Sequence, residues 1–223
     1  MVINTWVWVL GYDYLAHSWL DGPLRVEEDA LVPWLEGLGK FDASLARDAA
    51  DLVRCLDEPD DLKAAMWDFQ NCVVVPIPGR YVPPYASVYL DPSKSLWGAV
   101  TSLVRGKYNE ADLDWVGHSL RYPWVRAPDH LGIECAFAAE LWAASQSEQP
   151  PRMQRSQAFM ARHMLEWVPQ HVKQMQEQVM SLYWRRMAEF LDSWVHVNSL
   201  LLSEASVDNS NYPTLNGANI GDR

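Results

Sequence analysis

At 223 residues, with 49 % apolar and 21 % charged residues, the chain is long enough for a sizeable core and has the composition of a folded domain. Eighteen basic against twenty-nine acidic side chains give a net charge of −11, which argues against a nucleic-acid partner because phosphate binding needs clustered Lys and Arg. The charge is compatible with a basic peptide partner, and equally with a protein that it merely keeps soluble. Twelve tryptophans indicate heavy aromatic packing.

The cysteine pattern and the amino terminus bear on the compartment. Cys55, Cys72 and Cys135 are widely spaced and form no Cys-x-x-Cys pair, so we predict neither a disulfide framework nor a zinc ribbon and expect a reducing, cytoplasmic setting. The apolar run near the amino terminus has no preceding basic residue and is interrupted by Asp13 and His17. No stretch approaches the roughly 18 apolar residues of a membrane span. We therefore expect a soluble protein without a signal peptide and without stable membrane insertion.

Apolar residues at helical spacing predict helices along the first third of the chain. Four such stripes precede residue 73, and Asp42 is placed to cap the third of them. Residues 73–75 are three valines with β propensity, but Pro76 and Pro78 limit any strand there to a short one. We therefore predict helices followed by an irregular segment.

Residues 81–91 then interrupt the helical texture with the sequence YVPPYASVYLD. Pro83 and Pro84 favour extended backbone in the residues before them, so we predict a loop that is not helical. Three tyrosines are a large apolar load for a connector, which makes the loop a candidate binding site. The alternation of Tyr85 and Tyr89 with small residues is equally consistent with a segment that merely packs on the helices.

Helical patterns return after this loop. Asp91 followed by a proline predicts the start of a helix that Gly106 ends. Pro128 predicts the start of a further helix that carries a buried stripe to Trp142.

The carboxy-terminal third contains a predicted hinge. Residues 145–157 are polar and include two adjacent prolines, which predicts a linker. Beyond it we predict one helix that ends at Pro169, a long last helix over residues 172–201, and a disordered tail at residues 203–223. The prediction is thus one all-α domain over residues 1–202.

Residues 127–134, with the sequence APDHLGIE, form a second candidate site. Asp129 lies near the positive end of the predicted helix dipole, and Glu134 stands four residues after His130, where it would favour the protonated ring. Gly132 lowers helix stability by about 1 kcal/mol relative to alanine, which indicates a close approach by another segment. The segment is either a pocket that offers acceptors to a cationic ligand or a capped helix start with a satisfied histidine.

Several catalytic patterns are absent from the sequence. There is no His-Glu-x-x-His, no Gly-x-Ser-x-Gly, and no Glu followed three residues later by His, so the patterns of zincins, α/β-hydrolases and helical di-iron proteins are missing. The sequence GLGKF at residues 37–41 lacks the Ser or Thr of a phosphate loop. We predict a protein without catalytic residues, metal or cofactor.

Phe159, His163 and Trp167 share one helical face that leads to Pro169, which by itself indicates core packing. Together with PPYASVY at residues 83–89 and PDHLGIE at residues 128–134, however, this face resembles the TorD/DmsD/NarJ group of molybdoenzyme maturation chaperones. The order, the separations and the intervening helical texture agree over about residues 1–200. The residues that keep the shape of these motifs are Pro83, Pro84, Ser87, Pro128, Gly132 and Pro169.

The resemblance implies a cytoplasmic, all-α single helical bundle of the TorD/DmsD type, with a proline- and tyrosine-rich loop and a hinge before the last helices. Such proteins are chaperones and not enzymes. They bind the twin-arginine leader of a molybdopterin-containing oxidoreductase of the dimethyl-sulfoxide-reductase type, hold the apo-subunit until its cofactor is inserted, and prevent premature export. The implied partners are the molybdoenzyme catalytic subunit and its basic leader peptide. A monomer or a hinge-swapped homodimer is expected.

The family's leader-binding surface is carried over to Asp129 and His130, with the tyrosine loop beside them. Carboxylates can meet the guanidinium groups of a leader, and aromatic rings can meet either these groups or the apolar stretch that follows. The predicted peptide-binding residues are Asp129, His130, Glu134, Tyr85, Tyr89, Trp67, His163 and Trp167.

Two alternatives stay open at this point. One is a metal-dependent helical hydrolase that uses Asp129, His130, Glu134 and His163. The other is a leader-independent assembly factor that grips the client of a non-exported molybdoenzyme.

Overall fold

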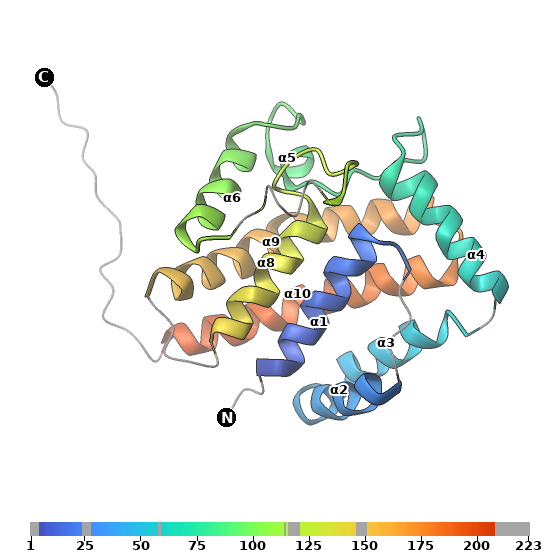
Figure 1. Cartoon of the computed structure of the whole chain (residues 1–223), viewed down its shortest axis with the longest axis horizontal. Helices are drawn as coiled ribbons and strands as arrows, with labels where there is room; N and C mark the ends of the chain where they lie inside the picture. The colour runs from blue at the N-terminus through green and yellow to red at the C-terminus, as the bar shows by residue number, and fades with distance from the viewer. Residues whose placement is uncertain are drawn as a thin grey trace, which may run out of the picture.

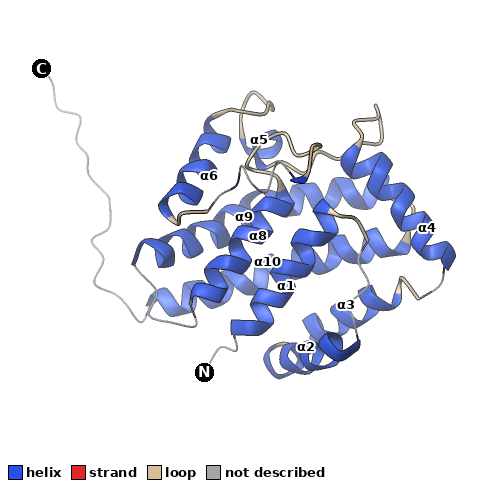
Figure 2. Ribbon diagram, viewed as in Figure 1, coloured by secondary structure: helices blue, strands red, loops and turns tan. Residues whose placement is uncertain are grey.

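The computed structural model describes residues 5–23, 28–57, 59–113, 115, 121–145 and 151–207 (Figure 1). Within these residues the chain is all-α, as predicted, and Figure 2 shows helices joined by loops. No helix in this part of the chain is both long and apolar enough to cross a bilayer. The helices are α1 (Thr5–Leu20), α2 (Glu28–Phe41), α3 (Ala43–Arg54), α4 (Pro59–Asp68), the π-helix η1 (Phe69–Val74), α5 (Ala86–Leu90), α6 (Ala99–Glu110), α8 (Leu131–Ala144), α9 (Pro151–Gln178) and α10 (Leu182–Val207).

Four helices form the centre of the bundle. α1 packs along α8 and α9 packs along α10, and α1 and α8 are apolar all round because neighbours cover each of their faces (Figure 1). The indole of Trp8 joins three of these helices, since it stacks on Trp142 at a centroid distance of 5.4 Å and lies 4.5 Å from the ring of Trp194. Gly11 faces the same indole of Trp194, which leaves no room for a side chain there.

The helical pair α2–α3 packs against this centre through α10. The predicted cap of α3 is confirmed, because Asp42 Oδ1 accepts the backbone N–H groups of Ser44 and Leu45 at 2.8 and 2.9 Å. Trp34 of α2 donates its indole N–H to the Val7 carbonyl at 3.2 Å. Tryptophan thus ties the outer pair to α1.

Residues 73–75 do not form even a short strand. Val73 and Val74 end the π-helix η1, which continues α4 and turns Phe69, Cys72 and Val73 toward the core. Burial of these side chains outweighs their β propensity. Cys55, Cys72 and Cys135 are buried free thiols.

The predicted boundaries of the last two helices are wrong. Pro169 lies inside α9, which continues to Gln178, and the real break falls at residues 179–181. There the buried carboxylate of Asp68 accepts the N–H groups of Met180 and Ser181 at 3.0 and 2.7 Å, and so caps the start of α10 from a distant segment. Trp167 and Met175 are fully buried on either side of Pro169, so packing keeps the helix continuous despite the proline.

Parts of the predicted hinge and of the predicted tail are helical. Residues 151–157 form the first turns of α9, with Pro151 at its first position, while residues 146–150 lie outside the described residues. α10 extends to Val207, so residues 203–207 are helical, and the rest of the predicted tail lies outside the described part of the chain.

The helix after residue 91 starts later than predicted. Asp91 does not begin α6. Its carboxylate instead accepts the N–H and hydroxyl of Ser93 and reaches the N–H of Ala99, where the helix starts. Gly106, the predicted end, lies inside α6.

Candidate functional site

The tyrosine-rich segment is not entirely a loop. Residues 81–84 lie outside any helix, as predicted, but residues 86–90 form the short helix α5, which corrects the prediction of a wholly non-helical segment. The two prolines restrict only the residues before them and leave those after them free to turn. The segment lies against residues 129–131, where Ala86 N–H donates to the Asp129 carbonyl at 3.0 Å and Leu131 N–H donates to the Pro84 carbonyl at 2.8 Å.

Tyr85 is buried and holds the neighbouring loop. Its hydroxyl donates to the Trp124 carbonyl at 3.2 Å and accepts the Arg126 N–H at 3.0 Å. Its ring meets the ring of His130 edge to face, with centroids 5.1 Å apart, and the two residues form an isolated antiparallel bridge. Tyr85 therefore presents no free aromatic face to a ligand in this conformation.

His130 caps α8 from within the core. The helix begins at Leu131 and not at Pro128, and His130 Nδ1 accepts the Gly132 N–H at 3.1 Å. Burial lowers the pKa of His130 to about 3, so the ring is neutral near pH 7. The expectation that Glu134 favours a protonated His130 is therefore wrong. Gly132 does mark a close approach, since a Cβ there would stand 2.6 Å from Leu20 Cγ.

Asp129 is fully buried, so it does not reach a ligand at the surface in this conformation. Its Oδ2 accepts the Ser87 N–H at 2.8 Å, and its Oδ1 accepts the Thr101 hydroxyl at 3.0 Å. The next carbonyl back, that of Pro128, accepts the buried hydroxyl of Tyr108 at 2.9 Å. This segment is a junction between α5, α6 and α8.

Glu134, His163 and Trp167 form a buried polar cluster between α8 and α9. One carboxylate oxygen of Glu134 lies 3.0 Å from His163 Nε2, and the other accepts the Trp167 indole N–H at 3.2 Å. Burial raises the pKa of Glu134 although His163 opposes this, and the pairing with Glu134 raises the pKa of His163 against the opposing effect of burial. Each member of the pair thus opposes the effect of burial on the charged form of the other.

Tyr89 extends this cluster toward the end of α9. Its ring stacks on Trp167 with centroids 5.5 Å apart, and its hydroxyl lies 3.1 Å from His171 Nδ1 and donates to Gln174 at 3.2 Å. Burial lowers the pKa of His171 to about 3. Tyr89 and Trp167 thus form packed support between α5 and α9.

A groove of about 390 Å³ opens directly beside this cluster, between α5, α6 and α9. Its volume is that of a small ligand pocket. Leu103 on its wall is 51 % exposed, and His163 on its floor is almost fully buried. The full lining is Leu90, Val100, Leu103, Phe159, Arg162, His163 and Glu166. Of the predicted peptide-binding residues, only His163 lines this groove, whereas Glu134, Trp167, Tyr89 and Asp129 lie among the helices that form it.

Trp67 stands apart from the others. It lies on α4, which Figure 1 shows on the opposite side of the molecule from α6, and its side chain is 42 % exposed. The guanidinium of Arg80 lies 4.5 Å from its ring centroid. The structure therefore does not bring Trp67 to the groove.

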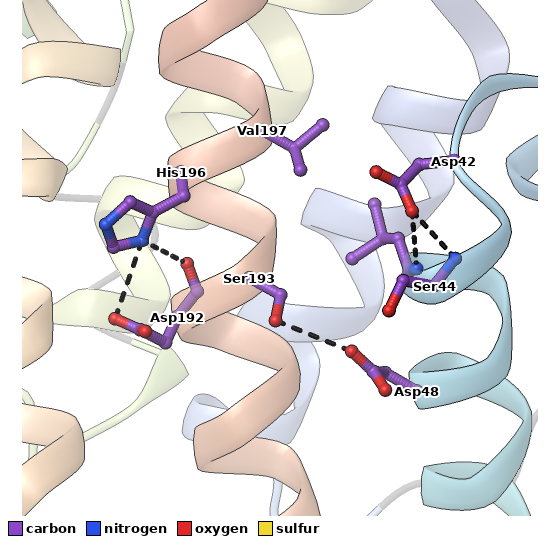
Figure 3. A pocket seen from close by; sticks show the side chains of 8 residues that line it. Asp42, Ser44, Asp48, Asp192, Ser193, His196 and Val197 are labelled. Atoms are coloured by element: carbon purple, nitrogen blue, oxygen red, sulfur yellow. Dashed lines mark hydrogen bonds and ion pairs between the residues drawn. The ribbon is translucent and has the colours of Figure 1, made fainter.

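A second hollow of about 340 Å³ lies between α3 and α10 (Figure 3). Its polar side chains bond to each other and to their own helices. Asp42 is used as the cap of α3, the Ser193 hydroxyl lies 3.5 Å from Asp48 Oδ2, and His196 Nδ1 donates to the Asp192 carbonyl at 2.9 Å. Because these groups are engaged locally, the groove beside His163 is the better candidate site.

The hydrolase alternative finds no centre in this geometry. The carboxylate of Asp129, the ring of His130 and the Glu134–His163 pair each bond to different partners and do not converge. In the part of the chain that the structure describes, no group of three or more His, Cys, Asp or Glu side chains is arranged to hold a metal ion.

Several residues of the site escaped the sequence analysis. Thr101 and His171 belong to no sequence motif. Their hydrogen-bond partners, Asp129 and Tyr89, lie 28 and 82 residues away in the chain, so no local pattern indicates these contacts. Leu103 and Arg162 are ordinary helix residues whose shared groove arises only when α6 lies against α9. Phe159 did belong to a sequence motif through its helical spacing from His163, but that spacing by itself indicated core packing and not a binding site.

Comparison with known proteins gives a family for this arrangement. Residues 38–173 match the family described as nitrate reductase delta subunit, and this span contains α5, α6, α8 and the groove. No curated protein matches the chain. The chain therefore belongs to the nitrate reductase delta subunit family, a family of molybdoenzyme maturation chaperones that are not themselves catalysts.

Proposed function

We propose that this chain is a cytoplasmic chaperone that binds the twin-arginine leader of an apo-molybdoenzyme subunit of the dimethyl-sulfoxide-reductase type. It holds that subunit until the molybdopterin cofactor is inserted and so prevents premature export. Membership of the maturation-chaperone family supports the general role. The groove between α5, α6 and α9 is the surface on which we expect the leader to bind.

The observation that carries this proposal is the apolar wall of the groove. Leu90, Val100, Leu103 and Phe159 line it, and the half-exposed side chain of Leu103 gains free energy when an apolar segment covers it. A leader offers such a segment directly after its arginines, and an amphipathic segment in an apolar groove is a recurring mode of peptide recognition.

The charges around the groove suggest where the arginines lie. Glu166 is exposed on the lining and can accept a guanidinium, with Arg162 one helical turn before it. Asp129 and Glu134, which the sequence suggested for this role, are instead hydrogen-bonded to groups inside the protein. We propose that they support the groove from below and that Glu166 meets the leader.

A titration of the purified chain with the leader peptide of its molybdoenzyme subunit tests this. We expect Leu103→Asp to weaken binding by about tenfold or more, because it places a charge in an apolar contact. Leu182→Asp is the matched control, since Leu182 is 53 % exposed at the first position of α10, does not line the groove, and its substitution should leave affinity unchanged. If neither the native leader nor an Arg→Ala leader binds, leader recognition is wrong.

A leader-independent assembly factor is the second candidate. It is favoured by the composition of the groove, whose single carboxylate, Glu166, is offset by Arg162. Equal binding of the client subunit with and without its leader would select this second function.

A further inference from the structure

The two oxygens of Asp129 bind two different walls of the groove. Oδ2 accepts the Ser87 N–H in α5 at 2.8 Å, and Oδ1 accepts the Thr101 hydroxyl in α6 at 3.0 Å. Asp129 and Thr101 are 0 and 1 % exposed, so solvent does not substitute for either bond. One carboxylate therefore joins two helices that carry the groove.

Each bond lies next to groove-lining side chains. Ser87 is three residues before Leu90, and Thr101 stands between Val100 and Leu103 on α6. Besides the bond that the Ala99 N–H donates to Asp91 Oδ2 at 3.1 Å, the position of Leu90 relative to Val100 and Leu103 thus depends on a link that runs through Asp129. No side chain of the groove makes this link itself.

The short helix α5 needs this support. It has only five residues, and its N-cap residue Tyr85 makes no capping bond with its side chain. The Asp129 carboxylate supplies that bond from another segment, to a backbone N–H of the first turn. A helix this short is not stable by itself, so its place depends on such contacts.

We infer that Thr101 is a positioning residue for client binding, which acts through Asp129 by setting the distance between the α5 and α6 walls of the groove. This inference rests on the proposed function of the groove. Thr101 and Asp129 are both too deeply buried to touch a client in this conformation.

Thr101→Val tests the inference because it keeps the shape of the side chain and removes only the donor. The probe is a fluorescent synthetic peptide with two adjacent arginines followed by a leucine- and alanine-rich stretch, and its affinity for the full chain is measured by anisotropy. We expect up to about tenfold weaker binding, because the free energy of one hydrogen bond to a charged acceptor limits how strongly this bond can hold the groove in its binding shape. Amide hydrogen exchange within α5 should become faster in the free protein.

Two further variants separate positioning from a general loss of stability. Thr101→Ser keeps the hydroxyl and should restore both affinity and slow exchange. Ser18→Ala removes another buried hydroxyl, which donates to the Tyr14 carbonyl at 2.8 Å on α1 and lies 3.2 Å from the Tyr183 hydroxyl, and should leave probe affinity and α5 exchange unchanged. This control also loses a buried hydroxyl, at a place that does not form the groove.

The outcomes are distinct. Unchanged affinity and unchanged α5 exchange in Thr101→Val would overturn the inference, and so would an equal loss of affinity in Ser18→Ala. If the wild-type chain fails to bind the probe, the proposed leader-binding function is at fault, and exchange in α5 still decides whether Thr101 holds this wall.

Discussion

Glu134 of α8 and His163 of α9 lie 3.0 Å apart in the core, although 29 residues separate them in the chain. The pair joins the PDHLGIE segment to the floor of the groove, since His163 also lines the groove. Two of the three motifs by which the sequence suggests the family thus meet in one contact.

Loss of one partner should be costly because the other remains buried and unpaired. We expect Glu134→Ala to lower the free energy of unfolding by about 3–5 kcal/mol. Glu166→Ala, at an exposed position of the groove lining, should change this free energy by less than about 0.5 kcal/mol. Urea unfolding of both variants measures the difference, and equal values for the two would contradict a structural role of the pair.

The break between α9 and α10 depends on Asp68. Asp68→Ala leaves the N–H groups of Met180 and Ser181 without their acceptor, so we expect a loss of about 2–3 kcal/mol in unfolding free energy. Asp68→Asn keeps one acceptor oxygen and should lose less. Amide exchange at residues 180–181 reports the local effect, and protection that survives in Asp68→Ala would show that Asp68 does not hold these N–H groups.

Two glycines inside helices should respond to alanine in opposite directions. Gly132→Ala places a Cβ 2.6 Å from Leu20 Cγ, and the resulting overpacking should cost about 1–3 kcal/mol. Among the described residues, a Cβ at Gly106 inside α6 would meet no atom of a neighbouring segment within 4 Å, so Gly106→Ala should stabilise the protein by about 0.5–1 kcal/mol. Thermal unfolding distinguishes them, and a stabilising Gly132→Ala would refute the close approach of α1 and α8.

The free energy of unfolding should decrease as the pH is lowered, because His130 is neutral in the folded chain and becomes protonated when the chain unfolds. Its pKa is about 3 in the folded chain and about 6.5 when unfolded, so between these values the unfolded state binds the extra proton. Unfolding free energy then falls as pH falls, by about 1.4 kcal/mol per pH unit for this histidine. His130→Asn removes the titration while retaining a side chain that caps helices well.

The test compares the two proteins between pH 6 and pH 4. Subtracting the variant from the wild type removes the contributions of His171, His163 and Glu134, which both proteins contain. We expect the wild type to have the steeper dependence of unfolding free energy on pH. Parallel curves would mean that His130 is not kept neutral by burial.

Sequence patterns correctly predicted those structural features that depend on residues close together in the chain. The helical texture, the Asp42 cap and the close approach at Gly132 all follow from residue types within a few positions of each other. The fold class was predictable for this reason, since apolar spacing states which face of each helix is buried. The family was predictable because three short motifs occur in register.

Contacts between distant segments decided the rest. α5 forms because Asp129 caps it from 42 residues away, and α9 ends where Asp68 binds backbone N–H groups more than 110 residues further on. The carboxylates that the sequence offered to a ligand were taken by these internal donors, because a buried charge is stable only when it is hydrogen-bonded. The sequence alone determined an all-α chaperone of this family. Only the tertiary structure decided that Asp129 and Glu134 support the groove while Leu103 and Glu166 face outward, since exposure depends on which helices come to lie together.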